Sequence, residues 1–357
     1  MLRSAAGSSR SRRASIGSRS RRRMPSDARA SFSTSEIVRV LEVFGIGGLK
    51  SLAELPAGSR RAAKLVATCE GGAYLLKRRD LLTAGLERIR YASEVHRHAA
   101  TMGVPCARLM TTASDEPFLV EGPYIYEVQG FVQGHRFAHQ HDQAIAAGAA
   151  LARLHDALAT FAASDAAPAS IYCRNPSVPA ALRKIESKAT GPAEREVCAA
   201  LLARYERAAN SPWPEVVGVT HSDYHPGNVL LDGAQVVAII DFDSARVAPI
   251  VSDLANAALQ FGMAPLVGGD PARWEPRFNE HCLRAIVRGY RSVRKPPKGT
   301  SASIAPLMIQ AAIAEVVAPV ARKGAFGHID GRAMLDFVDR KTQRIEESAT
   351  GIATLCA

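Results

Sequence analysis

Two short segments in the second half of the chain carry side chains whose types and spacing could do chemistry. The first, HSDYHPGN at residues 221–228, places Asp223 five residues before Asn228. A Pro-Gly pair between them prevents a helix, so the segment is predicted to be a loop. The second, IIDFD at residues 239–243, places Asp241 and another aspartate on either side of a phenylalanine.

The residues between these segments predict how the acids meet. VLL leads out of the loop into a strand, DGAQ forms a turn, and VVAIIDFD is a second strand. A tight hairpin of this kind returns Asp241 to Asn228. An amide and a carboxylate oxygen are hard ligands that Mg²⁺ accepts while it also holds phosphates. Asp223 is then free to act as a base, unless these acids and Asp232 are only turn-formers.

The same layout occurs in kinases, where a loop aspartate takes the hydroxyl proton and the following asparagine and aspartate bind metal. HSDYHPGNVL…IIDFDSARVAPIVSDLA resembles the aminoglycoside phosphotransferase superfamily, which includes bacterial stress-response, spore-coat-type and type II homoserine kinases. The family often has Gly where Ser222 stands. The resemblance implies an α+β, two-lobed, protein-kinase-like fold that binds ATP and Mg²⁺ between its lobes. It implies Asp223 as catalytic residue, and Asn228 and Asp241 as metal and nucleotide ligands.

A kinase also needs a lysine on its third strand and a helix glutamate that holds this lysine. AYLLKRR ends the third expected strand with Lys77, while Lys64 begins the second strand and is the competitor. The segment ASEVHRHAATMGVPCARLM resembles the family's helix and carries Glu94, with Glu87 as the runner-up on the same face. The resemblance therefore implies that Lys77 binds the nucleotide's phosphates and that Glu94 holds Lys77 in place.

The remaining nucleotide contacts are predicted from the connector between the lobes. YEVQGFVQGHRF at 126–137 aligns with that connector by resemblance, so adenine is expected to bind backbone groups from Val128 to Gly130. No GxGxxG loop is present, and the turn PAGSRR at 56–61 takes its place between the first two strands. Turns of this composition are common, so this segment alone indicates little.

The elements that position these residues fall into two regions. Residues 35–130 are predicted to form the nucleotide-binding sheet lobe, with a capped helix from Ser35, strands at 49–55, 61–69 and 73–78, and a helix at 82–102. Residues 131–357 are predicted to form a helical lobe with the catalytic loop and the acceptor site. Its expected helices follow residue 141 and then cover 178–189, 193–209, 252–262, 274–293, 302–322 and 331–349.

The net charge of +11 comes mainly from the amino-terminal tail. Residues 1–23 hold eight arginines and no acid, and without them 37 basic residues face 34 acidic ones. Residues 1–34 are predicted to be a disordered Ser/Arg-rich tail. It could be a nucleic-acid arm, a transit peptide or an upstream extension before Met24. We expect no nucleic-acid partner, because only the tail suggests one.

The bulk composition is that of a globular protein. Six scattered cysteines show no metal-ligand spacing, which favours free thiols in a reducing cytoplasm. No stretch is expected to span a membrane. The sequence does not specify an oligomeric state.

We therefore expect an ATP-dependent kinase that phosphorylates a hydroxyl of a small metabolite. From Ala255 onward, 14 basic residues outnumber nine acids, which disfavours a polycationic acceptor. The alternatives are a Ser/Thr protein kinase of the same superfamily and a catalytically silent nucleotide-binding or scaffold protein.

Overall fold

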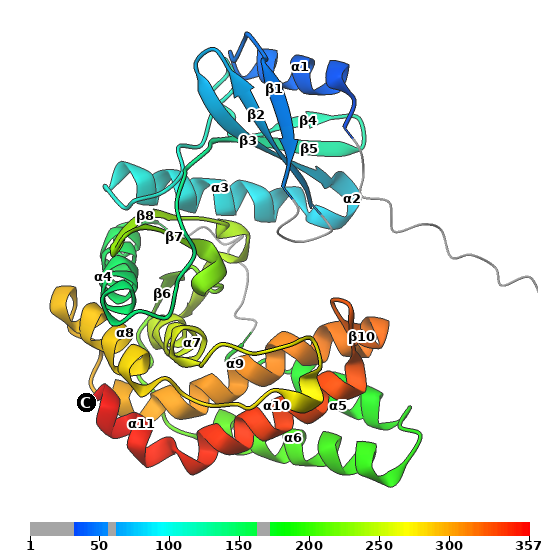
Figure 1. Cartoon of the computed structure of the whole chain (residues 1–357), viewed down its shortest axis with the longest axis vertical. Helices are drawn as coiled ribbons and strands as arrows, with labels where there is room; N and C mark the ends of the chain where they lie inside the picture. The colour runs from blue at the N-terminus through cyan, green and yellow to red at the C-terminus, as the bar shows by residue number, and fades with distance from the viewer. Residues whose placement is uncertain (1–31, 56–61, 163–171) are drawn as a thin grey trace, which may run out of the picture.

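The first lobe is built on a five-stranded antiparallel sheet with strand order β1-β2-β3-β5-β4 (Figure 1). The computed structural model describes residues 32–55, 62–162 and 172–357, so the expected turn at 56–61 and most of the tail lie outside it. The strands are β1 (Ser51–Glu54), β2 (Ala62–Cys69), β3 (Gly72–Asp80), β4 (Leu119–Glu121) and β5 (Tyr124–Gly130). The first three agree with the predicted strands to within two residues.

Helices cover the two faces of this sheet. Helix α1 (Thr34–Val43) packs its buried Ile37, Val40 and Leu41 on β2, β3 and β5. Helix α3 (Leu86–Thr101) lies between the sheet and the second lobe (Figure 1). The single helix predicted at 82–102 is interrupted at Gly85, whose φ of 75° separates α3 from the short α2 (Leu81–Ala84). A positive φ is readily available only to glycine, which explains the break.

Helix α1 is fastened to the sheet by one carboxylate. Ser33 and Glu36 form a capping box at the start of α1. Glu36 Oε1 also accepts hydrogen bonds from Arg78 Nη1 at 2.5 Å and from Tyr126 Oη at 2.7 Å. Burial alone raises the pKa of Glu36, but these hydrogen bonds outweigh it and lower the pKa below its ordinary value.

We expect Glu36→Gln to destabilise the folded protein by about 2 kcal/mol at neutral pH, because it weakens charge-assisted hydrogen bonds in a largely buried site. The folded pKa is lowered, so this stabilisation is fully present above the ordinary glutamate pKa of 4.5 and is lost as the pH falls through the folded value. Urea unfolding at several pH values measures it. Glu42→Gln on the exposed side of α1 is the control, and an equal loss in both variants would contradict the assignment.

The second lobe is mainly helical and contains three short two-stranded sheets within the described residues, β6 with β9, β7 with β8 and β10 with β11. Its helices agree with the predicted ones to within a few residues, except that α8 begins at Glu280 instead of 274 and that α11 was not predicted. Phe278 forms a bridge with Met263 and Asn279 caps α8, so the chain before Glu280 is held extended. The elements are α4 (His141–Leu158), α5 (Ser177–Glu186), α6 (Pro192–Asn210), β6 (Val217–Thr220), β7 (Val229–Asp232), β8 (Gln235–Ile239), β9 (Arg246–Pro249), α7 (Ile250–Gly262), α8 (Glu280–Val293), α9 (Thr300–Lys323), β10 (Ala325–Phe326), β11 (Ile329–Asp330), α10 (Gly331–Glu347) and α11 (Ala349–Cys356).

Helices α4 and α8 cross at very short range because each contributes a glycine. A Cβ atom on Gly148 would lie 1.9 Å from the carbonyl oxygen of Ile286, and one on Gly289 would lie 2.0 Å from that of Ile145. No other residue fits at either position without moving backbone. The close crossing brings Tyr290 of α8 within hydrogen-bond distance of α4, with consequences for the catalytic loop described below.

Helix α9 corrects one expectation from the sequence. By length and composition it could cross a membrane, whereas we expected no such stretch. Most of its apolar window, 72%, is buried inside the second lobe, and the core helix of a soluble protein passes the same test. This single helix is therefore weak evidence for a membrane location.

Candidate active site

The predicted catalytic loop folds back on itself between β6 and β7. Asn228 Nδ2 donates to the backbone oxygen of Asp223 at 2.9 Å and to its Oδ2 at 3.2 Å. The Pro-Gly pair forms one turn of 3₁₀ helix, and the backbone N–H of Gly227 donates to Nδ1 of His225 at 2.9 Å. The loop thus brings the expected base and the expected metal ligand together, as their spacing predicted.

Asp253, in helix α7, anchors this loop. Its two carboxylate oxygens accept the backbone N–H groups of His221 at 2.7 Å and Ser222 at 2.8 Å. Ser222 has a φ of 59°, a conformation that needs such support. His155 of α4 lies 3.2 Å from Asp253, and its other ring nitrogen lies 2.9 Å from the hydroxyl of Tyr290. The α4–α8 crossing is thereby connected to the geometry of the catalytic loop.

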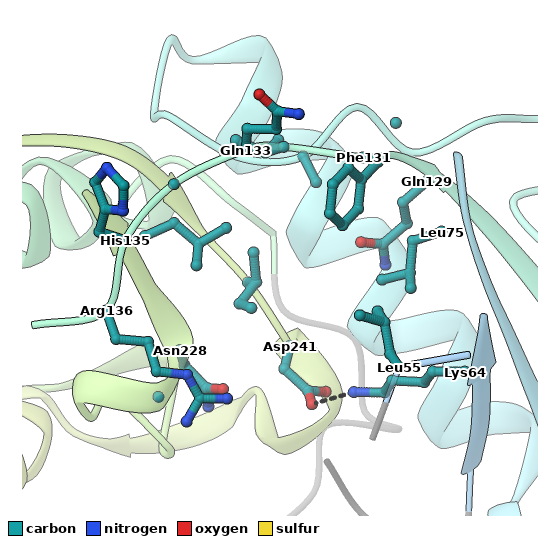
Figure 2. Close-up of a pocket in the computed structure, with 17 residues that line it drawn as sticks. Leu55, Lys64, Leu75, Gln129, Phe131, Gln133, His135, Arg136, Asn228 and Asp241 are labelled. Atoms are coloured by element: carbon teal, nitrogen blue, oxygen red, sulfur yellow. Dashed lines mark hydrogen bonds and ion pairs between the residues drawn. The ribbon is translucent and has the colours of Figure 1, made fainter. Parts of the chain in front are cut away.

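The hairpin of β7 and β8 returns Asp241 to Asn228. The N–H of Ile240 donates to the carbonyl oxygen of Asn228 at 2.9 Å. The side chains of Asn228 and Asp241 line one cavity (Figure 2). Asp241 has a φ of 65°, so the chain turns sharply at the strand end and exposes the carboxylate to the cavity. His221 is fully buried beneath this strand, and its Nε2 lies 3.2 Å from the carbonyl oxygen of Ile240.

Two lysines form ion pairs with Asp241. Lys77 Nζ lies 2.9 Å from its Oδ1, and Lys64 Nζ lies 3.1 Å from its Oδ2. Lys77 also contacts Asp243 at 2.6 Å, and Arg79 contacts Asp243 at 2.7 Å. Burial alone raises the pKa of Asp241, but Lys77 and Lys64 hold it well below its usual range. Both aspartates are therefore ionised at neutral pH.

The structure does not bring Glu94 to Lys77 as predicted. Glu94 is on an exposed part of α3, and within the described residues it forms no ion pair. The acids that contact Lys77 are instead Asp241 and Asp243. A further acid, Glu127 of β5, is opposite Lys77 in the sheet register and lies 3.6 Å from Arg79. The side of α3 that faces the site carries His96, whose ring stacks on Phe242 with centroids 4.7 Å apart.

The predicted adenine contacts at Val128 and Gly130 are also corrected. Val128 is fully buried and its carbonyl oxygen accepts from the N–H of Met110, while the N–H of Gly130 donates to Arg108. These backbone groups still belong to the sheet, so they are not free for a ligand. The connector proper begins after β5, and within the described residues Val132 and Gln133 have no backbone hydrogen-bond partner.

A cavity of about 590 Å³ lies between the lobes at this connector (Figure 2). Leu55 and Leu75 from the sheet face Leu230 and Ile240 from the second lobe, which suits a flat apolar ring. Gly130 lines this cavity although its N–H is occupied. The polar side chains of the lining are Lys64, Gln129, Gln133, His135, Arg136, Asn228 and Asp241.

Within the described part of the chain, no group of three or more His, Cys, Asp or Glu residues could hold a metal ion. Asn228 and Asp241 nevertheless suit Mg²⁺, which is commonly held by one or two protein ligands together with substrate phosphates. The amide nitrogen of Asn228 is used by Asp223, which leaves its oxygen available. The residues present therefore fit a metal that arrives with a nucleotide.

His225 and Asp223 interact within the loop. The imidazole Nε2 lies 3.7 Å from Asp223 Oδ1. Burial alone lowers the pKa of His225, but Asp223 outweighs burial and raises it above its ordinary value. Because Nδ1 is already used by the N–H of Gly227, the histidine braces the loop instead of offering a metal ligand.

A small antiparallel sheet above a helical lobe, with a loop Asp–Asn pair and a strand-end aspartate at one interlobe cavity, defines a kinase-like phosphotransferase fold. The chain belongs to the phosphotransferase enzyme family, whose family model matches residues 51–299. No curated protein matches the chain significantly.

Solved structures with the same fold share few residues with this chain. An amicoumacin kinase in complex with AMP-PNP and Ca²⁺ is 15% identical with a TM-score of 0.66, over 89% of this chain and 94% of that one. An aminoglycoside phosphotransferase from Alicyclobacillus acidocaldarius is 19% identical with a TM-score of 0.64, over 93% and 98%. A microcompartment-associated aminopropanol kinase is 15% identical with a TM-score of 0.66, over 90% and 99%.

Proposed function

We propose that this protein transfers the γ-phosphate of ATP to a hydroxyl group of a small metabolite. The observation that carries the proposal is the position of Asn228 and Asp241 on the wall of one interlobe cavity, with Asp223 hydrogen-bonded to Asn228. Membership of the phosphotransferase family supports the reaction class. The complete set of acids argues against a catalytically silent scaffold.

In this proposal the nucleotide enters the interlobe cavity with its adenine between the apolar residues of the two lobes. The backbone of Val132 and Gln133, which is free of other partners within the described residues, binds the adenine edge. Asn228 and Asp241 hold Mg²⁺, which would neutralise charge on the phosphates. Lys77 is buried behind Asp241 and fixes its carboxylate.

Asp223 has the role of general base in the transfer. As the acceptor oxygen forms a bond to the γ-phosphorus, the Asp223 carboxylate takes the hydroxyl proton. The bond between the γ-phosphorus and the bridging oxygen breaks, and ADP leaves with the electron pair. The loop is held by Asp253, so the carboxylate is positioned before the acceptor arrives.

The charge of the second lobe bears on the kind of acceptor. From Ala255 onward, 14 basic residues outnumber nine acids, which favours a small polar metabolite over a polycation.

The proposal is tested by incubating the protein with ATP and Mg²⁺ and a library of metabolite alcohols, with mass detection of phosphorylated products. We expect a phosphate ester of at least one small alcohol together with stoichiometric ADP. A protein that binds ATP but phosphorylates only serine or threonine in polypeptides would support the protein-kinase alternative instead.

A further inference from the structure

Two lysines, not one, reach the same aspartate from adjacent strands. Lys64 of β2 and Lys77 of β3 are direct partners in the antiparallel register. Like charges in this arrangement repel one another. Here the repulsion is offset because each ammonium contacts a different oxygen of Asp241.

The two lysines differ in their surroundings. Lys77 has two aspartate partners, its side chain is 5% exposed, and it is not part of the cavity wall. Lys64 has only Asp241 as an ion-pair partner within the described residues, its side chain is 13% exposed, and it lines the cavity. Figure 2 shows Lys64 reaching from the sheet to Asp241 at the cavity edge. Lys64 is therefore the lysine that a bound molecule meets.

The charges of this cluster are balanced without a ligand. Lys64, Lys77 and Arg79 face three acids, Asp241, Asp243 and Glu127. A divalent cation on Asp241 must displace at least one ammonium from a carboxylate oxygen. Lys77 keeps Asp243 when this happens, whereas Lys64 loses Asp241, the one ion-pair partner it has among the described residues. A polyphosphate that enters with the metal offers Lys64 a new anion in the same cavity.

We propose that Lys64 is a phosphate-positioning residue that occupies the metal position on Asp241 until metal and nucleotide bind together. This inference rests on the proposed nucleotide site and assigns a separate role to each lysine. Lys64 exchanges its ion pair with Asp241 for one with the phosphates. Lys77 stays behind Asp241 and keeps the carboxylate in place.

The test compares Lys64→Met with the wild type in calorimetric titrations of adenosine and of ATP, both with Mg²⁺ present. We expect Lys64→Met to weaken ATP binding by about tenfold or more, because one charge-assisted contact is lost. Adenosine, which lacks phosphates, should bind within about twofold of the wild type. Lys50→Met, the same change at an exposed position beside β1, should alter neither affinity.

A second titration uses Mn²⁺ alone, followed by its electron paramagnetic resonance. If Lys64 occupies the metal position, Lys64→Met should bind Mn²⁺ without nucleotide more tightly than the wild type. A purely structural ion pair predicts no such gain. Lys64→Gln serves in place of the methionine variant if thermal unfolding shows that the latter does not fold.

The outcomes distinguish the proposed role of Lys64 from the proposed nucleotide site. Unchanged ATP affinity in Lys64→Met, or an equal loss for adenosine and ATP, would overturn the role of Lys64 and leave the nucleotide site intact. A wild-type protein that binds neither adenosine nor ATP would overturn the nucleotide site and the Lys64 assignment with it. Weaker ATP binding, unchanged adenosine binding and tighter Mn²⁺ binding together would establish the exchange.

Discussion

Replacing Asp223 by Ala is expected to reduce phosphoryl transfer by about 10²- to 10⁴-fold, the usual effect of removing a positioned base. ATP binding should change little, because Asp223 is not part of the cavity wall in which the nucleotide is proposed to bind. The measurement is single-turnover product formation with the acceptor that the metabolite screen identifies. ATP affinity of the same protein is measured by calorimetry.

The control for this variant must remove a nearby acid without touching the loop. Asp232→Ala fits, because Asp232 is exposed at the end of β7 in the same hairpin. It should leave both turnover and ATP affinity unchanged. If Asp223→Ala retained near-complete turnover, Asp223 would be only a turn-former whose carboxylate accepts a hydrogen bond from the side-chain amide of Asn228.

The catalytic loop could be predicted from the sequence because its contacts are local. Asp223 and Asn228 are five residues apart, and the Pro-Gly pair between them dictates a turn that brings them together. The return of Asp241 follows equally from a short hairpin between two apolar strands. Periodicity and turn chemistry determine such features with little help from the rest of the chain.

The partners of Lys77 could not be predicted in the same way. Which side of α3 faces the sheet depends on tertiary packing, and the stacking of His96 on Phe242 leaves Glu94 at the exposed surface. Glu127 gave one usable signal, since an acid inside an otherwise apolar strand needs a buried partner. The register that places it opposite Lys77 depends on a sheet neighbour distant in sequence.

The adenine contacts were misplaced for a related reason. Val128 and Gly130 pair with the segment around Arg108 and Met110, a partner that is not adjacent in the sequence. The resemblance alone placed the adenine contacts at these residues, and it did not show that their backbone groups are used by the sheet. Asp253 shows a similar dependence on tertiary structure, because it holds the catalytic loop from helix α7, further along the chain.

Asp241→Asn is expected to remove most of the benefit that Mg²⁺ brings to ATP binding. The substitution replaces an anionic ligand by a neutral one, which matters most when a divalent cation must be held. Without metal, ATP should bind at least as well as in the wild type, since Lys64 no longer has the Asp241 charge as a competitor for the phosphates. The ratio of ATP affinities with and without Mg²⁺ should therefore fall by about tenfold or more.

This ratio distinguishes a metal ligand from a structural acid. If Asp241 only kept two buried lysines in place, its loss would weaken ATP binding equally with and without Mg²⁺, and the ratio would stay at the wild-type value. Thermal unfolding measures any loss of stability separately, and this loss should be small because Asp243 still forms an ion pair with Lys77 in the variant. Asp232→Asn makes the same chemical change in the same hairpin and should alter neither the ratio nor the unfolding temperature.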